Sequence, residues 1–215
     1  MQKYSLFSLI KNAFSNHQNW EVAWKDPTPK SEYDVVIIGG GGHGLATAYY
    51  LAKEHNIRNV AIIEKGWIGG GNVGRNTTII RSNFMYDANA RFNEFGMDLW
   101  RNLSQELNFN VMFSPRGIIN LAHSDAQMNA YARRGNSMRL NGIDAKLLDR
   151  DEVKKLIPMA DFSDEVRFPI FGGLMQPSAG TARHDAVAWG YARQADDMGV
   201  DIIQHCEVTG FDVVN

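Results

Sequence analysis

The chain has 215 residues, of which 44% are hydrophobic and 11% aromatic, so it can bury the core of one large domain or two small ones. Its 22 basic and 24 acidic residues leave a formal net charge of -2, which gives no electrostatic excess to favour nucleic acid or an anionic membrane as a partner. The single cysteine, Cys206, excludes a disulfide within the chain, and no Cys/His pairs stand at zinc-ligand spacing, so no metal is expected. This composition is typical of a globular protein of a reducing cytoplasm.

Residues 1–32 are predicted to form an N-terminal extension. Leu6, Phe7, Ile10 and Phe14 recur at helical spacing on one face, which favours a short helix that packs on its own subunit or on a partner. No apolar run reaches the ~20 residues that span a bilayer, and no small-residue cleavage site follows, so neither a signal peptide nor a membrane span is expected. A proline-containing connector at 25–31 precedes a domain that begins near residue 33.

The next segment has the pattern of a βαβ unit. A β-branched run at 34–38 is followed by a glycine-rich turn, a helical segment at 45–55 and a second buried strand at 59–63. This order predicts two parallel strands joined by a right-handed crossover.

The remaining elements mix helices and strands. Further helices are expected at 88–107, 125–140, from Asp149 as N-cap to the residue before Pro158, and at 183–198. In the first of these, Phe92, Phe95, Leu99 and Leu103 share one side. Strands are expected at 117–123, 145–148, 168–176 and 201–214. Because the sequence stops inside the last of these strands, we expect a truncated chain.

Together the elements predict an α/β fold with a discontinuous organisation. Residues 33–113 and 179–215 are assigned to a nucleotide-binding domain, and 114–178 to part of an inserted α+β substrate domain.

Gly39, Gly41 and Gly44 stand at the dinucleotide-binding spacing, directly after a strand and before a helix. Gly39 permits a tight turn, Gly41 lets the main chain approach a pyrophosphate, and Gly44 allows close packing of helix on strand. Alone, such a turn is equally consistent with a structural role. Glu64, about twenty residues beyond Gly44, favours nucleotide binding because its carboxylate can accept hydrogen bonds from both ribose hydroxyls, and it disfavours a 2′-phosphorylated nucleotide.

A glycine-rich loop at 66–74 leaves the main chain bare where the second half of a dinucleotide would lie, although a flexible loop would have the same composition. Arg75 and Arg81 follow, with hydrogen-bonding residues between them. Arg75 suits a pyrophosphate, and Arg81 suits a substrate carboxylate held in a two-pronged geometry. A structural ion pair of Arg81 and a buried strand at 77–80 are the alternatives.

Three segments, 36–50, 64–67 and 75–83, closely resemble the β subunits of bacterial heterotetrameric sarcosine oxidases and, more widely, amine-oxidising flavoproteins of the DAO family. The similarity extends from about residue 20 to 214. The resemblance implies an FAD-binding Rossmann domain of the glutathione-reductase type, with non-covalent FAD and with Arg81 on the substrate carboxylate. The residues that it places against FAD are Gly39, Gly41, Gly42, His43, Gly44, Glu64, Lys65, Asn72, Arg75, Thr77, Thr78 and Val208. A plain core valine at 208 is equally consistent.

His184 opens a predicted helix, between Arg183 and Asp185. A histidine flanked by charges is usually a solvated surface group, but a helix start favours the neutral, nucleophilic imidazole that flavin attachment requires. The resemblance sharpens this interpretation, because the matching histidine of the family carries covalent FMN. It implies FMN on His184, with Arg183 near the FMN phosphate or ring.

The resemblance also implies the activity. Sarcosine would be oxidised at its N-methyl carbon, with electrons passing through FAD and FMN to oxygen, and glycine, hydrogen peroxide and formaldehyde or methylene-tetrahydrofolate as products. The α, γ and δ subunits would be the partners, and NAD and tetrahydrofolate would bind to a partner subunit. The alternatives are an enzyme for dimethylglycine or another secondary amine, and a non-catalytic flavin-binding or assembly subunit.

Overall fold

The computed structural model describes residues 5–18 and 22–213. They divide into two compact units. The first comprises the described residues up to Thr77, Leu103–Met112 and those from Arg183 onward, and the second comprises Thr78–Asn102 and Phe113–Ala182. The segment expected as an inserted domain, 114–178, therefore lies within the second unit, which also takes in Thr78–Asn102. Its role in binding substrate stays a prediction.

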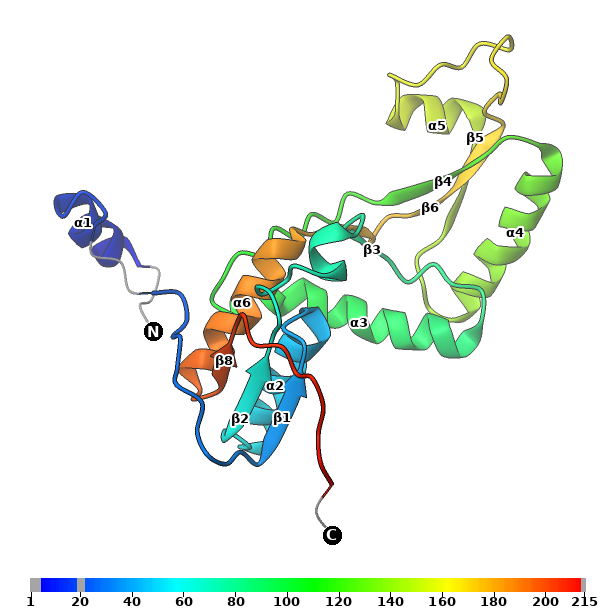
Figure 1. The fold of residues 1–215 in the computed structure, drawn as a ribbon. Helices are drawn as coiled ribbons and strands as arrows, with labels where there is room; N and C mark the ends of the chain where they lie inside the picture. Colours follow the sequence, from blue (N-terminus) through cyan, green and yellow to red (C-terminus); the bar gives the residue numbers. More distant parts are fainter. Residues whose placement is uncertain (1–4, 19–21, 214–215) are drawn as a thin grey trace. The chain divides into compact units, whose positions relative to one another are not determined.

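The first unit contains a three-stranded sheet of parallel strands. Strands β1 (Val35–Ile38), β2 (Val60–Ile63) and β8 (Asp201–Ile203) lie in the order β1-β2-β8 (Figure 1). Helix α2 (Gly42–His55) connects β1 to β2, so the predicted βαβ unit is present. The α/β fold class predicted from the sequence is confirmed by this topology.

Burial differs between the strands of the sheet. The first three residues of β2 are completely buried, as are Ile202 and, nearly so, Ile203 of β8. In β1, by contrast, Val36 is 50% exposed and Ile38 is 65% exposed. The side chains of β1 therefore alternate between a face toward α2 and an apolar face toward solvent.

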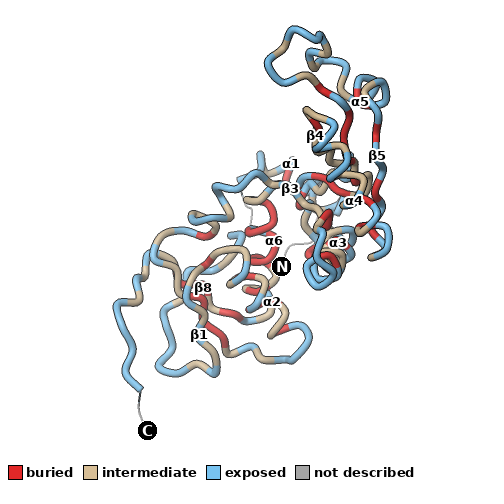
Figure 2. Tube along the Cα trace, turned by 90° about the vertical axis from the view of Figure 1, so that its right-hand side faces the viewer, coloured by how far each residue is buried: buried red, intermediate tan, exposed pale blue. Residues whose placement is uncertain are grey.

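Helices α2 and α6 (His184–Asp197) pack against each other. Helix α6 is buried along most of its length, largely through alanines and a glycine, which allow close approach (Figure 2). A side chain at Gly190 would press on Leu107 and Phe109, so the packing of that segment on α6 favours glycine. The rings of Tyr49 and Tyr191 pack between the two helices at a centroid distance of 5.5 Å.

The second unit is built on an antiparallel sheet in the order β4-β6-β5. Its strands are β4 (Ile118–Ala122), β5 (Lys146–Asp149) and β6 (Gly172–Gln176), and it is covered by helices α4 (Asp125–Leu140) and α5 (Arg150–Leu156). Asp149 caps α5 as expected, in a capping box with Glu152. Two short strands, β3 (Ile79–Ile80) and β7 (Gly180–Thr181), pair separately. Helix α3 (Asp87–Glu106) contributes residues to both units, and a single 3-10 turn, η1 (Asn72–Arg75), belongs to the first.

Two strand predictions were too long. The segment 201–214 forms only the short strand β8, because His205 has a left-handed conformation with φ of 55° that ends the extended run. Val214 lies outside the described residues. The segment 168–176 is a strand only from Gly172, since Pro169 has no N–H to donate to a ladder.

The apolar side of α3 is exposed in its first half. Phe92 and Phe95 are 77% and 65% exposed, whereas Ala90 and Met97, on the opposite side, are completely buried. Leu103 is buried as expected, but it belongs to the first unit.

The N-terminal extension forms helix α1 (Leu6–Phe14), with the Ser5 hydroxyl accepting a hydrogen bond from the Ser8 amide. The apolar side chains that define its predicted face are exposed in this chain. The connector is held to the first unit by an ion pair of 2.9 Å between Lys30 and Asp201. No helix among residues 5–18 and 22–213 combines the length and apolar character of a membrane span.

Candidate functional site

The glycine turn adopts the geometry that its spacing predicts. Gly39 has a φ of 106°, a conformation that favours glycine, and its amide donates to the Ile63 carbonyl at 2.8 Å. A side chain at Gly44 would clash with the Gly39 carbonyl oxygen, so only glycine lets α2 start this close to β1. A side chain at Gly41 would instead meet only the Val73 side chain, at 4.0 Å, in otherwise open space.

The first turn of α2 has no side-chain cap. Gly41 is the N-cap residue, and no side chain accepts a hydrogen bond from the amides that follow. Those N–H groups have no partner within the helix, and the helix dipole adds partial positive charge there. With bare main chain at Gly41 and Gly42, followed by the amide of His43, the turn presents N–H groups of the kind that bind a pyrophosphate.

Glu64 lies at the end of β2, directly beside the turn. Its two carboxylate oxygens accept hydrogen bonds from the amides of Gly40, at 2.7 Å, and Gly66, at 2.8 Å. A carboxylate has about four acceptor positions, so each oxygen keeps one for a ribose hydroxyl. The main chain thus fixes the orientation of the group that is predicted to bind ribose, and no residue pattern signalled these two amide contacts.

The loop at 66–74 is packed, and its contacts explain its glycines. The Gly69 amide donates to the Gly40 carbonyl at 3.0 Å, which holds the loop on the turn. A side chain at Gly69 would press on Ala188 of α6, and one at Gly74 would collide with the Gly69 carbonyl. The loop is therefore closely packed rather than flexible, and Val73 contacts the glycine turn.

The other residues of the first unit that are predicted to contact FAD differ in exposure. Lys65, Asn72, Arg75 and Thr77 are exposed, and Val208 is half-buried in a segment without regular structure. Asn72 and Arg75 lie in the turn η1, whose carbonyls at Asn72 and Val73 accept from the Asn76 side chain.

His184 is the first residue of α6, as predicted. Its Nδ1 atom is buried and has no hydrogen-bond partner among the described residues. The flanking charges pair with each other, since Arg183 donates to both oxygens of Asp185 at 2.9 and 2.6 Å. This hydrogen-bonded pair lowers the pKa of Asp185 to about 2 and raises the pKa of Arg183. His184 is thus left with an orphaned ring nitrogen at a helix N-terminus, between charges that largely cancel.

Thr78 and Arg81 belong to the second unit. Thr78 has a φ of 62°, which is strained for a β-branched residue. Arg81 follows β3, and its guanidinium donates to the Asn83 side-chain oxygen and lies 5.0 Å from the centre of the Phe84 ring. The alternative of an ion pair is not seen, since neither Arg81 nor its neighbour Arg134 contacts a carboxylate within the described ranges.

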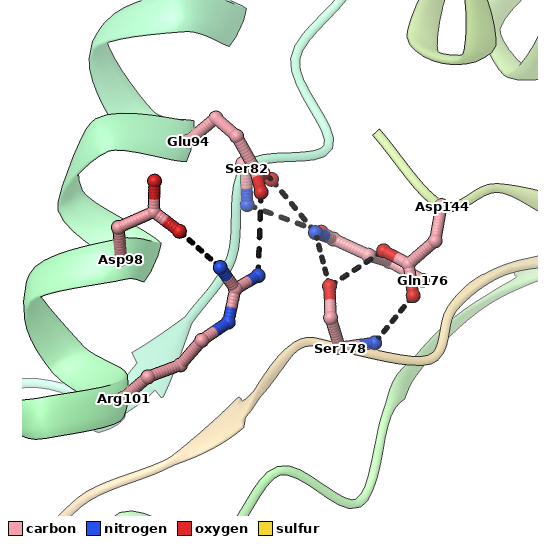
Figure 3. Close-up of polar contacts among 7 residues, drawn as sticks. All are labelled: Ser82, Glu94, Asp98, Arg101, Asp144, Gln176 and Ser178. Carbon is pink, nitrogen blue, oxygen red and sulfur yellow. Dashed lines mark hydrogen bonds and ion pairs between the residues drawn. The ribbon is translucent and has the colours of Figure 1, made fainter. Parts of the chain in front are cut away.

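A polar network around the buried side chains of Ser82 and Gln176 was not predicted from the sequence (Figure 3). The Gln176 side chain accepts from the Ser82 amide at 3.1 Å and donates to the Ser82 hydroxyl at 2.7 Å. Ser82 donates in turn to Glu94, at 2.6 Å. At the other end Gln176 donates to Ser178, which donates to Asp144 at 2.5 Å. The network joins the segment that follows β3 to the segment that precedes β7.

No group of three or more potential metal-binding side chains occurs in the part of the chain that the structure describes.

Comparison with known proteins gives consistent results. The model of the family described as FAD dependent oxidoreductase matches residues 34–215. The chain is 62% identical to the sarcosine oxidase subunit beta of Rhizobium meliloti, over 97% of this chain and 50% of that protein. It is 53% identical to the protein of the same name from Rhodobacter capsulatus, over 98% of this chain and 50% of that one.

Among solved structures, L-proline dehydrogenase from P. horikoshii superimposes with a TM-score of 0.78 at 29% identity, covering 87% of this chain and 48% of that one. The chain thus spans about half the length of the curated relatives that it matches. Since the family model covers most of the chain, and the strand-turn-helix geometry agrees with it, the chain belongs to the family of FAD-dependent oxidoreductases.

Proposed function

We propose that this chain carries the adenosine and pyrophosphate part of an FAD site in an enzyme that oxidises sarcosine, within a multi-subunit complex. The observation that carries the proposal is the joint geometry of the glycine turn and Glu64, in a chain 62% identical to a sarcosine oxidase β subunit. The amides at Gly41, Gly42 and His43 would bind the pyrophosphate, and Glu64 the ribose.

Bound FAD would supply the two-electron acceptor chemistry that amino-acid side chains lack. The residues of this chain contribute binding and orientation. The buried contacts of Glu64 hold its carboxylate in place before the nucleotide arrives, so little side-chain freedom is lost on binding. Lys65, Asn72, Arg75, Thr77, Thr78 and Val208 are proposed to contact the remainder of the FAD, without a covalent bond.

Arg81 is proposed to bind the carboxylate of sarcosine. Its planar, permanently charged guanidinium matches a carboxylate in two hydrogen bonds, and no acidic side chain of the described segments competes for it. Substrates without a carboxylate would bind weakly for the same reason.

His184 is proposed to carry FMN covalently, with Arg183 near the FMN. The support is chemical: an unprotonated ring nitrogen is the nucleophile that such a bond requires, and Nδ1 of His184 is buried without a partner among the described residues. The α, γ and δ subunits, and NAD and tetrahydrofolate bound to one of them, complete the proposed complex in the cytoplasm.

The test uses the assembled complex that contains this chain. Anaerobic addition of sarcosine should bleach the flavin absorption, and dimethylglycine at the same concentration should do so more slowly. A complex that binds FAD but is bleached by neither amine would support a non-catalytic subunit. Faster bleaching by dimethylglycine would support the other amine oxidase.

A second test addresses FMN alone. A mass spectrum of the denatured complex should show an FMN-sized addition on the peptide that contains His184. The addition should disappear in His184→Ala while FAD is retained, and its presence on another peptide would contradict the assignment.

A further inference from the structure

The candidate carboxylate site contains a second cation. Asn83 is completely buried, and it binds two guanidinium groups through different atoms. Its side-chain oxygen accepts from Arg81, and its main-chain oxygen accepts from Nε of Arg134, at 3.0 Å, and from the Nη2 atom of the same side chain. One residue therefore determines the positions of both positive charges.

Asn83 is itself held in place. Its side-chain amide donates to the Asn120 side-chain oxygen at 2.8 Å. Asn120 lies on β4 and Arg134 on α4, so two elements distant in sequence converge on the residue two positions after Arg81. The Asn83 side-chain oxygen is thereby held as an acceptor for Arg81, because the Asn83 side chain cannot rotate without breaking its bonds to both Arg81 and Asn120.

The two cations have no compensating negative charge. Within residues 78–102 and 113–182 neither guanidinium forms an ion pair, and each is only partly exposed. Burial lowers the pKa of Arg134, and the charge of Arg81 lowers it further. Two like charges held this close repel each other. An anion bound between them would be attracted to both and would offset the repulsion.

We propose that Arg134 is a second substrate-binding cation, which acts with Arg81 on the carboxylate of the amino-acid substrate, and that Asn83 is the positioning residue for both. This inference rests on the function proposed above. It predicts that the enzyme prefers substrates with a full negative charge. One arginine would supply two hydrogen bonds, and the second cation adds attraction to that charge.

The test compares sarcosine with its neutral amide, sarcosinamide, in the assembled, flavin-loaded complex. Arg134→Met removes the charge and keeps an apolar stem, and Arg134→Lys restores the charge. Arg133→Met is the matched control, because it removes the same charge from the adjacent, exposed position of α4. The dissociation constant of acetate, measured by its perturbation of flavin absorption, reports binding of a carboxylate without turnover.

We expect Arg134→Met to raise KM for sarcosine and the dissociation constant of acetate about tenfold, as for loss of one hydrogen bond to a charged group, with kcat within about threefold. KM for sarcosinamide should stay unchanged, Arg134→Lys should recover part of the loss, and the Arg133→Met control should match the unaltered complex. Equal losses for sarcosine and sarcosinamide, or a lower melting temperature with unchanged acetate binding, would show that Arg134 is only structural.

Arg81→Met separates this inference from the function on which it rests. If Arg81→Met leaves acetate binding unchanged, the carboxylate site itself is misplaced. If Arg81→Met weakens it and Arg134→Met does not, only the second cation is wrong. Should Arg134→Met fail to assemble, Asn120→Ala tests the positioning role of Asn83 instead, since it removes the partner of the Asn83 side-chain amide without altering either charge. Acetate binding should then weaken, and unchanged acetate binding would contradict the proposed role of Asn83.

Discussion

The two units of the chain build their candidate sites from different material. In the first, the nucleotide turn consists of main chain, with a positive φ at Gly39, a glycine at 44 where any side chain would collide, and one carboxylate held by two amides. In the second, the surroundings of Arg81 are built mainly from side chains, and several of their hydrogen bonds join positions 37 to 94 residues apart. A main-chain site depends on local conformation and tolerates little change at its glycines, whereas a side-chain site depends on the packing of the whole unit.

The strongest way to break the first site is Gly44→Ala. The added methyl group would collide with the Gly39 carbonyl, so α2 must move away from β1, at a cost of about 3 kcal/mol. We expect the purified complex to lose most of its FAD, measured by absorption after denaturation. Gly96→Ala is the control, because a methyl group there meets no atom within 4 Å, and this variant should retain FAD.

Glu64→Gln should weaken FAD binding without unfolding the turn. One oxygen becomes an NH2 group, which then faces the amide of Gly40 or Gly66, so a hydrogen bond is lost along with a ribose acceptor. The dissociation constant of FAD should rise about tenfold or more, measured by titration of the apo complex. Glu32→Gln, at an exposed position, should leave it unchanged, and an unaltered constant in Glu64→Gln would refute the assigned role.

Gln176→Leu tests the side-chain site of the second unit. It leaves the buried Ser82 amide without its acceptor and removes the donor to the Ser82 hydroxyl, which keeps only its bond to Glu94, at a cost of about 2 kcal/mol. The melting temperature should fall by a few degrees, and KM for sarcosine should rise as the chain around Arg81 loosens. FAD content should remain that of the unaltered complex; loss of FAD would mean that the two sites are not independent.

The smallest expected effect concerns the Arg183–Asp185 pair. Because the folded pKa of Asp185, about 2, lies below the usual carboxyl value, the pair stabilises the fold above about pH 4, and this contribution is lost as pH falls toward 2. The two side chains are partly exposed, at 60% and 28%, so screening by solvent keeps the contribution small. At pH 7 the unaltered chain should have a larger free energy of unfolding than the Asp185→Asn variant. This difference should shrink below about pH 4 and diminish in high salt. A difference that grows on acidification would contradict this account.

The same contrast explains what could be predicted from the sequence. The spacing of Gly39, Gly41 and Gly44 predicted both the turn and the parallel strands, because the positive φ of Gly39 and the close approach at Gly44 are local requirements that favour glycine. The helix start at His184 was predictable, but its buried, unpartnered nitrogen was not, since burial depends on neighbours elsewhere in the chain. Asn83, Asn120 and Arg134 carry no signal by type or spacing, because contacts between distant segments are set by the fold.

The exposed edge of β1 has a practical consequence. Val36 and Ile38 lie on a strand whose outer N–H and C=O groups have no neighbouring strand in the described part of the sheet. An apolar strand of this kind is a template for pairing between molecules. Preparations of this 215-residue polypeptide by itself should self-associate with rising concentration, and the substitution Ile38→Lys should keep them dispersed in light-scattering measurements.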